Sequence, residues 1–340
     1  MDWDWARVVY ELENYKGMRH CCPLTLDTLH GSMWALDPHP SKTFAASLST
    51  VMRENQDGML AYSIHRIRQL ITEANIQFNP RETPRCTQMG LGTFGWKYDP
   101  TVIRLAVELG VGLIDTAEGY GYGRVETALG LALDGMAFDN VTTKVRKDHM
   151  SPNALPKALE RSIRKLGRIP HVQLHYPNPR HPNALRQLAS LRMRGKARSV
   201  GVGNCSVDMV EAWQRQLTEV AGDVLYSVQV PFSLIDQRAN EVLIPYCQQR
   251  GILVLAYSPL GQKFTHVDQP VLRQIAKKHA ASPAQVALAW ILGHHGVMPI
   301  PRTNNTNHLQ QNMESVTLVL PSEDMETLSK KYTTTHAGEL

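Results

Sequence analysis

Four titratable side chains follow one another in the middle of the sequence, each at or just beyond the end of an expected strand. Asp115 ends an apolar run, and Tyr120 follows it in a glycine-flanked turn. The next apolar run ends at Lys144, and the one after it ends at His175. A carboxylate, a phenol, an ammonium and an imidazole can donate, accept or stabilise protons, so together they could carry out acid–base chemistry.

Each of these residues also has a structural explanation when it is taken alone. Asp115 could cap a helix, and Tyr120 could be a packed aromatic. Lys144 could be a surface charge, and His175 a hydrogen-bonded histidine of the interior. Their order along the chain and their shared position at strand ends favour one common site over four unrelated roles.

The elements that would position these residues begin at Met89, where short apolar runs start to alternate with longer amphipathic stretches. Apolar runs rich in Val, Ile and Leu, separated by helical patterns, are typical of a parallel sheet covered by helices. The eight expected strands are Met89–Phe94, Gly112–Thr116, Val141–Val145, Val172–His175, Val200–Gly203, Leu225–Val230, Ile252–Tyr257 and Val297–Ile300. The helical patterns between them include Thr101–Leu109, Asn153–Leu166, Ala184–Met193, Val207–Leu217, Asn240–Arg250 and Pro283–Gly293. Eight strands of this kind predict an α/β fold, the (β/α)8 TIM barrel, rather than an open sheet.

In such a barrel the carboxyl ends of the strands share one mouth, where the chemistry of the fold takes place. Polar residues recur at the expected strand ends, while the strand interiors are apolar. These polar residues are Asp115, Lys144, His175, Asn204, Gln229, Tyr257 and Arg302. The sequence therefore predicts a single site assembled around the mouth of the barrel.

Residues 1–84 differ from the rest of the chain, and we expect an N-terminal, partly helical extension ahead of a barrel over residues 85–340. The clearest helical spacing of apolar residues lies within Leu60–Asn75. Pro80 and Pro84 indicate a linker at the end of the extension. No motif in it points to chemistry. Two roles of the extension are alternatives: a docking element for a partner, and a lid over the barrel mouth.

A glycine-rich motif at Gly90–Gly95 has the pattern G-x-G-x-x-G, and Asp115 lies at the spacing of a ribose-binding acid. The preceding Arg85–Gln88 is not a buried strand. No helical pattern follows the glycines directly, so no helix N-terminus would meet a pyrophosphate there. We therefore do not assign an open dinucleotide-binding sheet to this motif.

From Met89 to about Tyr332 the sequence resembles the aldo-keto reductase family. The matching motifs are Asp115-Thr116-Ala117 with Tyr120-Gly121, Thr143-Lys144, Leu174-His175-Tyr176-Pro177, Gly195-Lys196-Ala197-Arg198-Ser199-Val200-Gly201-Val202 and Ala256-Tyr257-Ser258-Pro259-Leu260-Gly261. The resemblance implies a (β/α)8 barrel and a reversible, NAD(P)H-dependent reduction of an aldehyde or ketone to an alcohol. It also implies a catalytic tetrad made of Asp115, Tyr120, Lys144 and His175.

The chemistry of carbonyl reduction explains these four residue types. Hydride addition leaves a developing alkoxide that needs a proton, and a free phenol, with a pKa of about 10, is a weak acid at neutral pH. We expect Lys144 to lower the pKa of Tyr120, and Asp115 to keep Lys144 charged and in place. Tyr120 is then the general acid, and His175 orients the substrate oxygen as a neutral hydrogen-bond donor.

No side chain transfers hydride, so the reaction needs a cofactor, which by resemblance is NADPH, with NADH as an alternative. Asn204 and Gln229 match positions that bind the nicotinamide carboxamide, and Tyr257 the one that stacks on the ring. Arg302 suits the 2′-phosphate of NADPH because a guanidinium binds phosphate with two parallel hydrogen bonds. The full set of expected cofactor-binding residues is Thr93, Asp115, Asn204, Gln229, Tyr257, Ser258, Pro259, Leu260, Arg302, Thr303, His308, Gln311 and Asn312.

Three departures from the family pattern affect the cofactor site. Gly203 replaces a usual serine and removes one hydroxyl contact. His308 stands where the family often has a second arginine, and Gln311 where a glutamate often meets the adenine. We therefore expect the protein to bind NADPH more tightly than NADH, but by a smaller difference in affinity than is usual in the family.

Four aromatic residues, Phe94, Trp96, Tyr122 and Tyr176, are expected to line an apolar pocket beside the tetrad. Such a pocket suits aldehydes or ketones with hydrophobic or aromatic parts. The sequence does not select among a sugar, a reactive aldehyde and a specialised metabolite. The alternative function is that of a cofactor-sensing auxiliary subunit that uses the barrel as a binding module, because relatives of that kind can retain the tetrad.

The composition argues against several other classes of protein. Hydrophobic residues make up 43% and charged residues 20%, which is typical of a globular chain. The net charge is +5. The densest basic cluster has helical spacing and is interpreted as a solvated helix face; it consists of Arg161, Arg164, Lys165 and Arg168. No nucleic-acid partner is therefore expected. Five irregularly spaced cysteines predict neither a disulfide framework nor a metal site. With no signal peptide and no apolar run long enough to span a bilayer, a cytoplasmic protein is expected. The oligomeric state is not predicted.

Overall fold

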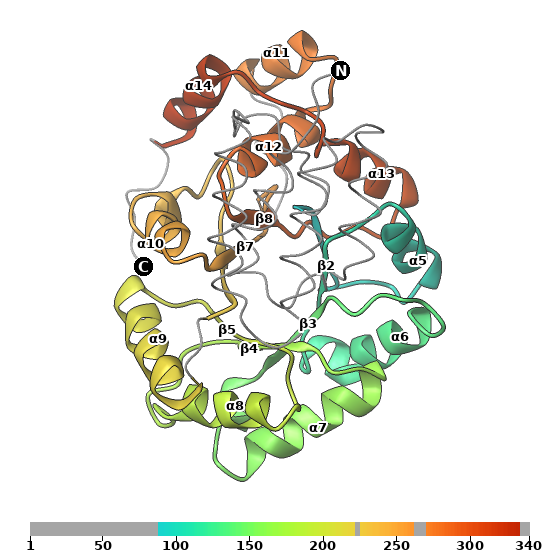
Figure 1. Ribbon diagram of the computed structural model, residues 1–340. Helices are drawn as coiled ribbons and strands as arrows, with labels where there is room; N and C mark the ends of the chain where they lie inside the picture. Colours follow the sequence, from blue (N-terminus) through green and yellow to red (C-terminus); the bar gives the residue numbers. More distant parts are fainter. Residues whose placement is uncertain (1–87, 222–224, 262–269, 334–340) are drawn as a thin grey trace, which may run out of the picture. The chain divides into compact units, whose positions relative to one another are not determined.

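The computed structural model describes residues 88–221, 225–261 and 270–333. Eight parallel strands form one sheet in which each strand pairs with the next in chain order (Figure 1). They are β1 (Gly90–Gly92), β2 (Leu113–Asp115), β3 (Val141–Val145), β4 (His171–Leu174), β5 (Val200–Gly203), β6 (Ser227–Pro231), β7 (Leu253–Tyr257) and β8 (Val297–Pro299). The predicted (β/α)8 barrel is confirmed.

The barrel closes where β1 meets the end of β8. The backbone N–H of Gly92 donates to the carbonyl oxygen of Pro301 at 3.0 Å. A Cβ atom at Gly90 would lie 2.6 Å from Cγ2 of Ile300, and one at Gly92 would lie 2.9 Å from the Ile300 carbonyl oxygen. These two glycines are needed because the two strands approach closely, which explains the glycine-rich motif without a phosphate-binding turn.

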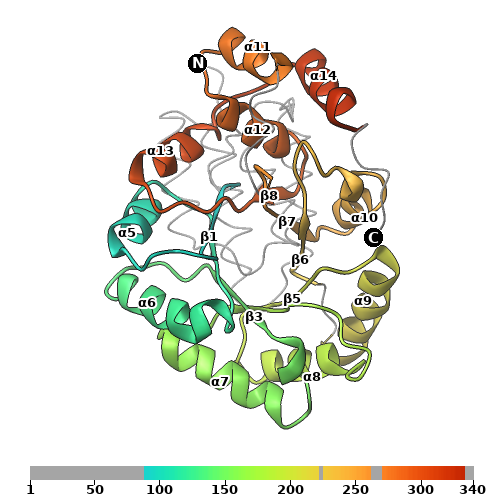
Figure 2. The same ribbon diagram turned by 180° about the vertical axis from the view of Figure 1, so that it is seen from behind.

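Helices surround the sheet, as the view from behind in Figure 2 shows. They are α5 (Pro100–Glu108), α6 (Arg124–Ala132), α7 (Ala154–Leu166), α8 (Ala184–Met193), α9 (Val207–Ala221), α10 (Leu243–Gln249), α11 (Pro270–Lys278), α12 (Pro283–Leu292), α13 (Thr306–Glu314) and α14 (Ser322–Thr333). Single 3-10 turns follow β2, β3 and β6: η2 (Tyr120–Gly123), η3 (Lys147–His149) and η4 (Arg238–Asn240).

Helix α7 illustrates how the sequence builds this outer layer. Leu155, Ala158, Leu159 and Leu166 are buried and lie on one stripe of the helix, with charged residues on the opposite face. Gly167 ends α7 in the left-handed conformation, with φ of 66°, which glycine adopts without a steric penalty.

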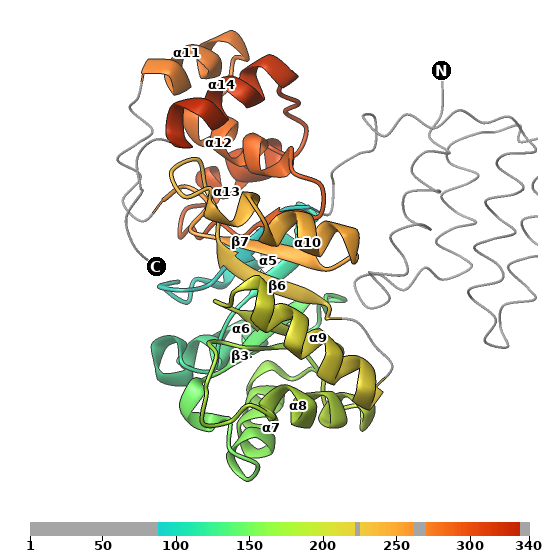
Figure 3. The ribbon, with the colours of Figure 1, turned by 90° about the vertical axis from the view of Figure 1, so that its left-hand side faces the viewer.

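The last helices of the barrel pack by polar contacts as well as apolar ones. The side view in Figure 3 shows α11 and α14 next to each other. Asp324 on α14 accepts hydrogen bonds from Lys278 at 3.0 Å, and lies 2.7 Å from Nε2 of His279 just beyond α11. These contacts fix α14 to the outside of the barrel.

The expected extension over residues 1–84, and with it the boundary ahead of residue 85, lies outside the described residues. Within the described ranges, no helix combines the length and apolar character that crossing a membrane requires.

Candidate active site

The barrel brings the four predicted residues to one mouth. Asp115 is the last residue of β2, Lys144 the fourth residue of β3, and His175 follows β4 directly. Tyr120 begins the turn η2 that leads from β2 to α6. Asp115 and Lys144 are only 3% and 1% exposed, so their opposite charges are removed from solvent together.

Lys144 is the centre of this cluster. Its Nζ donates to the Asp115 carboxylate at 2.7 Å, to the Thr116 carbonyl oxygen at 2.8 Å and to Oη of Tyr120 at 3.5 Å. Three oxygen acceptors match the three N–H donors of an ammonium group. Since Oη of Tyr120 accepts from Lys144, the phenol keeps its own proton available for another acceptor.

The pKa of Tyr120 differs from our expectation. Burial, followed by the Asp115 carboxylate, raises the pKa of Tyr120 above its ordinary value. The expected lowering of this pKa by Lys144 is wrong for the protein alone, because Asp115 at 2.7 Å offsets the lysine charge and the phenol is largely shielded from water. The phenol is therefore protonated at neutral pH, which is the form that a proton donor needs.

His175 lies beside Tyr120 and is uncharged. Burial and the positive charges of Lys144 and Arg146 lower the pKa of His175 to about 4. Its ring meets the Tyr120 ring edge-on, with centroids 6.1 Å apart, and stacks on Tyr176 at 4.8 Å. A neutral imidazole can donate one hydrogen bond to a substrate oxygen, as expected from the sequence.

The low pKa of His175 has a measurable consequence for stability. Between about pH 6.5 and about 4, the unfolded chain binds a proton at this position that the folded protein does not. The contribution of His175 to stability is therefore complete above about pH 6.5 and is lost as the pH falls to about 4. We expect the urea midpoint of His175→Gln to fall less steeply over this range than that of the wild type. An NMR titration midpoint of His175 near its ordinary value would contradict this prediction.

A chain of side-chain amides extends from Asp115 across the inside of the barrel. Nε2 of Gln229 donates to Asp115 at 2.8 Å and to Oε1 of Gln173 at 3.2 Å. Nε2 of Gln173 donates in turn to Oγ of Ser227 at 2.8 Å. The sequence analysis missed Gln173. The feature that could have identified it is a single amide side chain in the middle of an otherwise apolar strand. Gln229 thus positions Asp115, and both N–H groups of its amide are occupied by protein acceptors.

Asn204 and Tyr257 form a second polar contact at the mouth. Nδ2 of Asn204 donates to the His175 carbonyl oxygen at 2.9 Å, and the Tyr257 hydroxyl donates to Oδ1 of Asn204 at 2.8 Å. Asn204 adopts a left-handed backbone with φ of 56°, which asparagine tolerates better than most residues. The Tyr257 ring is consequently held in place with one part buried and one part open, as a stacking platform requires.

The segment after β8 carries the predicted phosphate-binding residues. The exposed guanidinium of Arg302 lies close to Gly95, where an added Cβ would be 3.9 Å from Cζ. The Thr303 hydroxyl makes a local contact, donating to the Asn305 carbonyl oxygen at 3.2 Å. Asn305 caps α13 by accepting from the backbone N–H of His308 at 3.1 Å. The exposed guanidinium of Arg302 is therefore available to bind an anion, and it lies next to the turn formed by Thr303 and Asn305.

The other predicted cofactor-binding residues differ in their burial and backbone conformation. Thr93 is buried, and its hydroxyl donates to the Asp115 carbonyl oxygen at 2.9 Å. Ser258 has a left-handed backbone with φ of 49°. Pro259 and Asn312 are buried, Leu260 is half-buried, and His308 and Gln311 are exposed.

Three of the four predicted pocket aromatics are exposed, and one is not. Phe94 is 70% exposed and meets the Tyr120 ring edge-on at 5.2 Å, while Tyr176 is 48% exposed. Tyr122 is 94% exposed, although it lies in the same turn as Tyr120. Trp96 is 4% exposed and belongs to the core cluster under α5. Phe94 and Tyr176 are thus the aromatics that the structure places against Tyr120 and His175.

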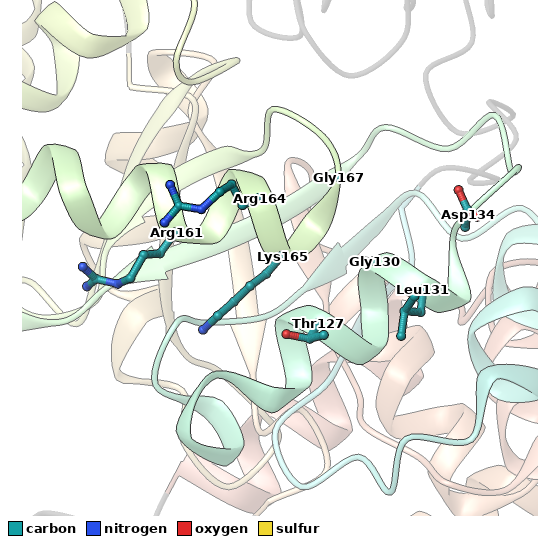
Figure 4. Close-up of a pocket in the computed structure, with 8 residues that line it drawn as sticks. All are labelled: Thr127, Gly130, Leu131, Asp134, Arg161, Arg164, Lys165 and Gly167. Carbon is teal, nitrogen blue, oxygen red and sulfur yellow. The ribbon is translucent and has the colours of Figure 1, made fainter.

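A separate pocket of about 630 Å³ lies on the outside of the barrel between α6 and α7 (Figure 4). It is lined by Thr127, Gly130, Leu131, Asp134, Arg161, Arg164, Lys165 and Gly167. Arg168, expected on the same solvated face, instead donates to the carbonyl oxygens of Leu133 and Phe138 beyond α6. For Arg168 the prediction of a solvated role is therefore wrong. In the described ranges, no group of three or more His, Cys, Asp or Glu residues could hold a metal ion.

The fold and this mouth define a (β/α)8-barrel enzyme with a buried lysine–aspartate pair against a tyrosine. A sequence model of the Aldo/keto reductase family matches residues 88–333, and the chain belongs to this family. This confirms the family and the class of enzyme, an oxidoreductase acting on carbonyl groups, that the sequence motifs predicted.

Individual relatives agree with this assignment. The chain is 33% identical over 245 residues to the methylglyoxal reductase YeaE of Escherichia coli strain K12, a match that covers 69% of this chain and 85% of that protein. It is 30% identical over 253 residues to the methylglyoxal reductase DkgB of Escherichia coli O157:H7, covering 71% and 91%. A crystal structure of an aldo-keto reductase from Klebsiella pneumoniae in complex with NADPH superposes with a TM-score of 0.67 at 27% identity, covering 72% of this chain and 90% of that one.

Proposed function

We propose that this protein reduces an aldehyde or ketone with NADPH, and that Tyr120 donates the proton. The observation that carries the proposal is the position of Lys144, which donates to Asp115, Thr116 and Tyr120 at once. A buried ammonium in hydrogen-bond contact with a phenol stabilises the phenolate that proton donation leaves behind.

The residues present fit a nicotinamide dinucleotide. Tyr257 offers a half-buried ring whose hydroxyl is fixed by Asn204, and each atom of the Asn204 amide retains one further hydrogen-bonding position. Arg302 offers an exposed guanidinium for a phosphate group. We assign the nicotinamide to Asn204, Tyr257 and the amide oxygen of Gln229, whose N–H groups are occupied, and the 2′-phosphate to Arg302 with Thr303. When bound, the cofactor supplies the hydride.

The residues of the mouth would then act on the substrate oxygen. As negative charge develops on that oxygen, Tyr120 transfers its hydroxyl proton to it. The Lys144 ammonium, held by Asp115, stabilises the resulting phenolate. Neutral His175 donates a hydrogen bond to the same oxygen and orients the carbonyl group.

Small reactive aldehydes are the substrates we propose first, because two relatives are named methylglyoxal reductases. The exposed rings of Phe94 and Tyr176 next to the tetrad also suit aldehydes with an apolar or aromatic part. The test is to incubate the purified full-length chain with NADPH and a panel of methylglyoxal, aromatic aldehydes and aldose sugars while following the absorbance of the reduced cofactor. Binding of NADPH without turnover of any carbonyl would overturn this function in favour of a cofactor-sensing subunit.

The choice between NADPH and NADH is predicted to depend on Arg302. Hydrogen bonds to charged groups contribute about 1.5–3 kcal/mol, so Arg302→Ala should weaken NADPH binding about tenfold to a hundredfold. NADH lacks the 2′-phosphate, and its affinity should change less than about twofold. Fluorescence titration of both cofactors measures this, with Arg215→Ala on the exposed face of α9 as the control for a lost positive charge. Tighter binding of NADH than NADPH by the wild type would refute the role of Arg302.

A further inference from the structure

A buried carboxyl group that the proposed mechanism does not use lies directly behind the site. Glu126 is on α6, and its side chain is fully buried. Its Oε1 accepts a hydrogen bond from the Thr143 hydroxyl at 2.7 Å. Among the residues that the structure describes, its Oε2 has no hydrogen-bond partner, and Nζ of Lys165 lies 3.8 Å away. Figure 4 shows Lys165 reaching from α7 across to α6.

Removing the Glu126 carboxyl group from water costs free energy, so its presence in the interior needs an explanation. Burial raises the pKa of Glu126, although the hydrogen bond from Thr143 and the charge of Lys165 lower it. An apolar side chain of similar size would fill the same space between α6, α7 and β3 without removing a carboxyl group from water. The carboxyl group is therefore better explained by the contact it makes than by the volume it fills.

That contact joins the two segments that carry the reacting groups. Thr143 immediately precedes Lys144 on β3, and successive side chains on a strand point to opposite faces. Thr143 therefore points outward to α6 while Lys144 points into the barrel. Glu126 lies in the first turn of α6, which begins directly after the turn η2 that starts with Tyr120. This hydrogen bond thus ties α6, which follows the Tyr120 turn, to the Lys144 strand, in addition to the Glu118 N–H that donates to the Lys144 carbonyl oxygen at 3.2 Å.

The Tyr120 turn benefits from such an anchor because one of its residues, Tyr122, has a strained backbone. Three successive residues, Gly121, Tyr122 and Gly123, have left-handed backbones with φ of 55°, 57° and 84°. A left-handed backbone is unfavourable for tyrosine but not for glycine, so the conformational cost of this turn lies at Tyr122. The side chain of Tyr122 is exposed, so burial of its ring does not offset this conformational cost.

We propose that Glu126 is a positioning residue whose hydrogen bond with Thr143 sets the distance between Oη of Tyr120 and Nζ of Lys144. This inference rests on the proposed function, in which that 3.5 Å contact stabilises the phenolate. Displacement of a reacting group by about 1 Å can cost a hundredfold in rate, so a contact behind the site can affect turnover without touching substrate or cofactor.

The direct test is Thr143→Val, which preserves the shape of the side chain and removes the hydroxyl. We expect kcat to fall about tenfold, while KM for the carbonyl and the Kd of NADPH change less than about twofold. In the crystal structure of this variant the separation of Oη of Tyr120 and Nζ of Lys144 should increase. Glu126→Gln keeps an oxygen acceptor for Thr143 and should retain kcat within about threefold of wild type.

A double-mutant cycle separates this role from general destabilisation. Glu126→Leu should lose as much kcat as Thr143→Val, and combining the two should cause no further loss, because both remove the same hydrogen bond. Thermal unfolding of each variant identifies any loss that comes from misfolding. Thr142→Val is the matched control, since the buried Thr142 hydroxyl is on the same strand and has no hydrogen-bond partner within the described part of the chain. It should leave kcat unchanged.

The outcomes distinguish this inference from the function on which it rests. If Thr143→Val keeps the kcat of an active wild type, or if Glu126→Gln is as impaired as Glu126→Leu, the positioning role is wrong and the reductase function stands. If the wild type turns over no carbonyl compound, the function fails. An unchanged Tyr120–Lys144 separation in the Thr143→Val crystal would refute the positioning role independently of any activity.

Discussion

Replacing Tyr120 with phenylalanine should reduce kcat about 10²–10⁴-fold, the range that a lost general acid usually costs. The ring would remain and could keep its edge-on contact with Phe94, so the shape of the mouth should persist. Because Tyr120 is not assigned to cofactor binding, the Kd of NADPH should stay within about twofold of wild type. Steady-state kinetics with the best aldehyde of the panel, together with fluorescence titration of NADPH, measure both quantities.

The turn that carries Tyr120 supplies its own control. Tyr122 is two residues away and 94% exposed, and Tyr122→Phe removes the same hydroxyl group from the same segment. We expect this variant to retain wild-type kcat. Near-normal turnover of Tyr120→Phe would remove Tyr120 from the mechanism, and equal losses in both variants would indicate damage to the turn rather than loss of a proton donor.

The barrel could be predicted from the sequence because β-strand patterning and strand-end polarity agree. Asp115, Lys144 and His175 each end an apolar run, and the parallel sheet brings such ends together whatever the details of the helices. Helix α13 was not predicted, because its residues are mainly polar and only Leu309 and Asn312 are buried, which leaves no apolar stripe to detect.

Details of the site that depend on side-chain direction could not be read from the sequence. Trp96 and Phe94 are both aromatic and only two residues apart, yet Trp96 packs into the core and Phe94 is exposed. Gly95 between them has a left-handed backbone with φ of 73°, which turns the chain at that point. The raised pKa of Tyr120 has a similar origin, since burial and the distance to Asp115 exist only in the folded chain.

Removing the charge of Lys144 should affect stability and catalysis by different routes. Lys144→Met leaves the Asp115 carboxylate buried, with a Gln229 N–H at 2.8 Å as its remaining side-chain donor. Breaking one side of a buried ion pair costs about 3–5 kcal/mol, so the free energy of unfolding should fall by about that amount. Turnover should fall about 10³-fold or more, because no cation remains to stabilise the phenolate of Tyr120.

The double variant Lys144→Met with Asp115→Asn separates the two effects. It removes both charges, and an asparagine in place of Asp115 can still accept from Gln229, so most of the lost stability should return. Activity should not return, because a neutral pair offers no charge to the phenolate. Urea unfolding and turnover, measured on both variants, give the comparison. A double variant as unstable as Lys144→Met would show that the unpaired carboxylate is not the cause of the instability. Recovered turnover would show that proton donation by Tyr120 does not depend on the lysine charge.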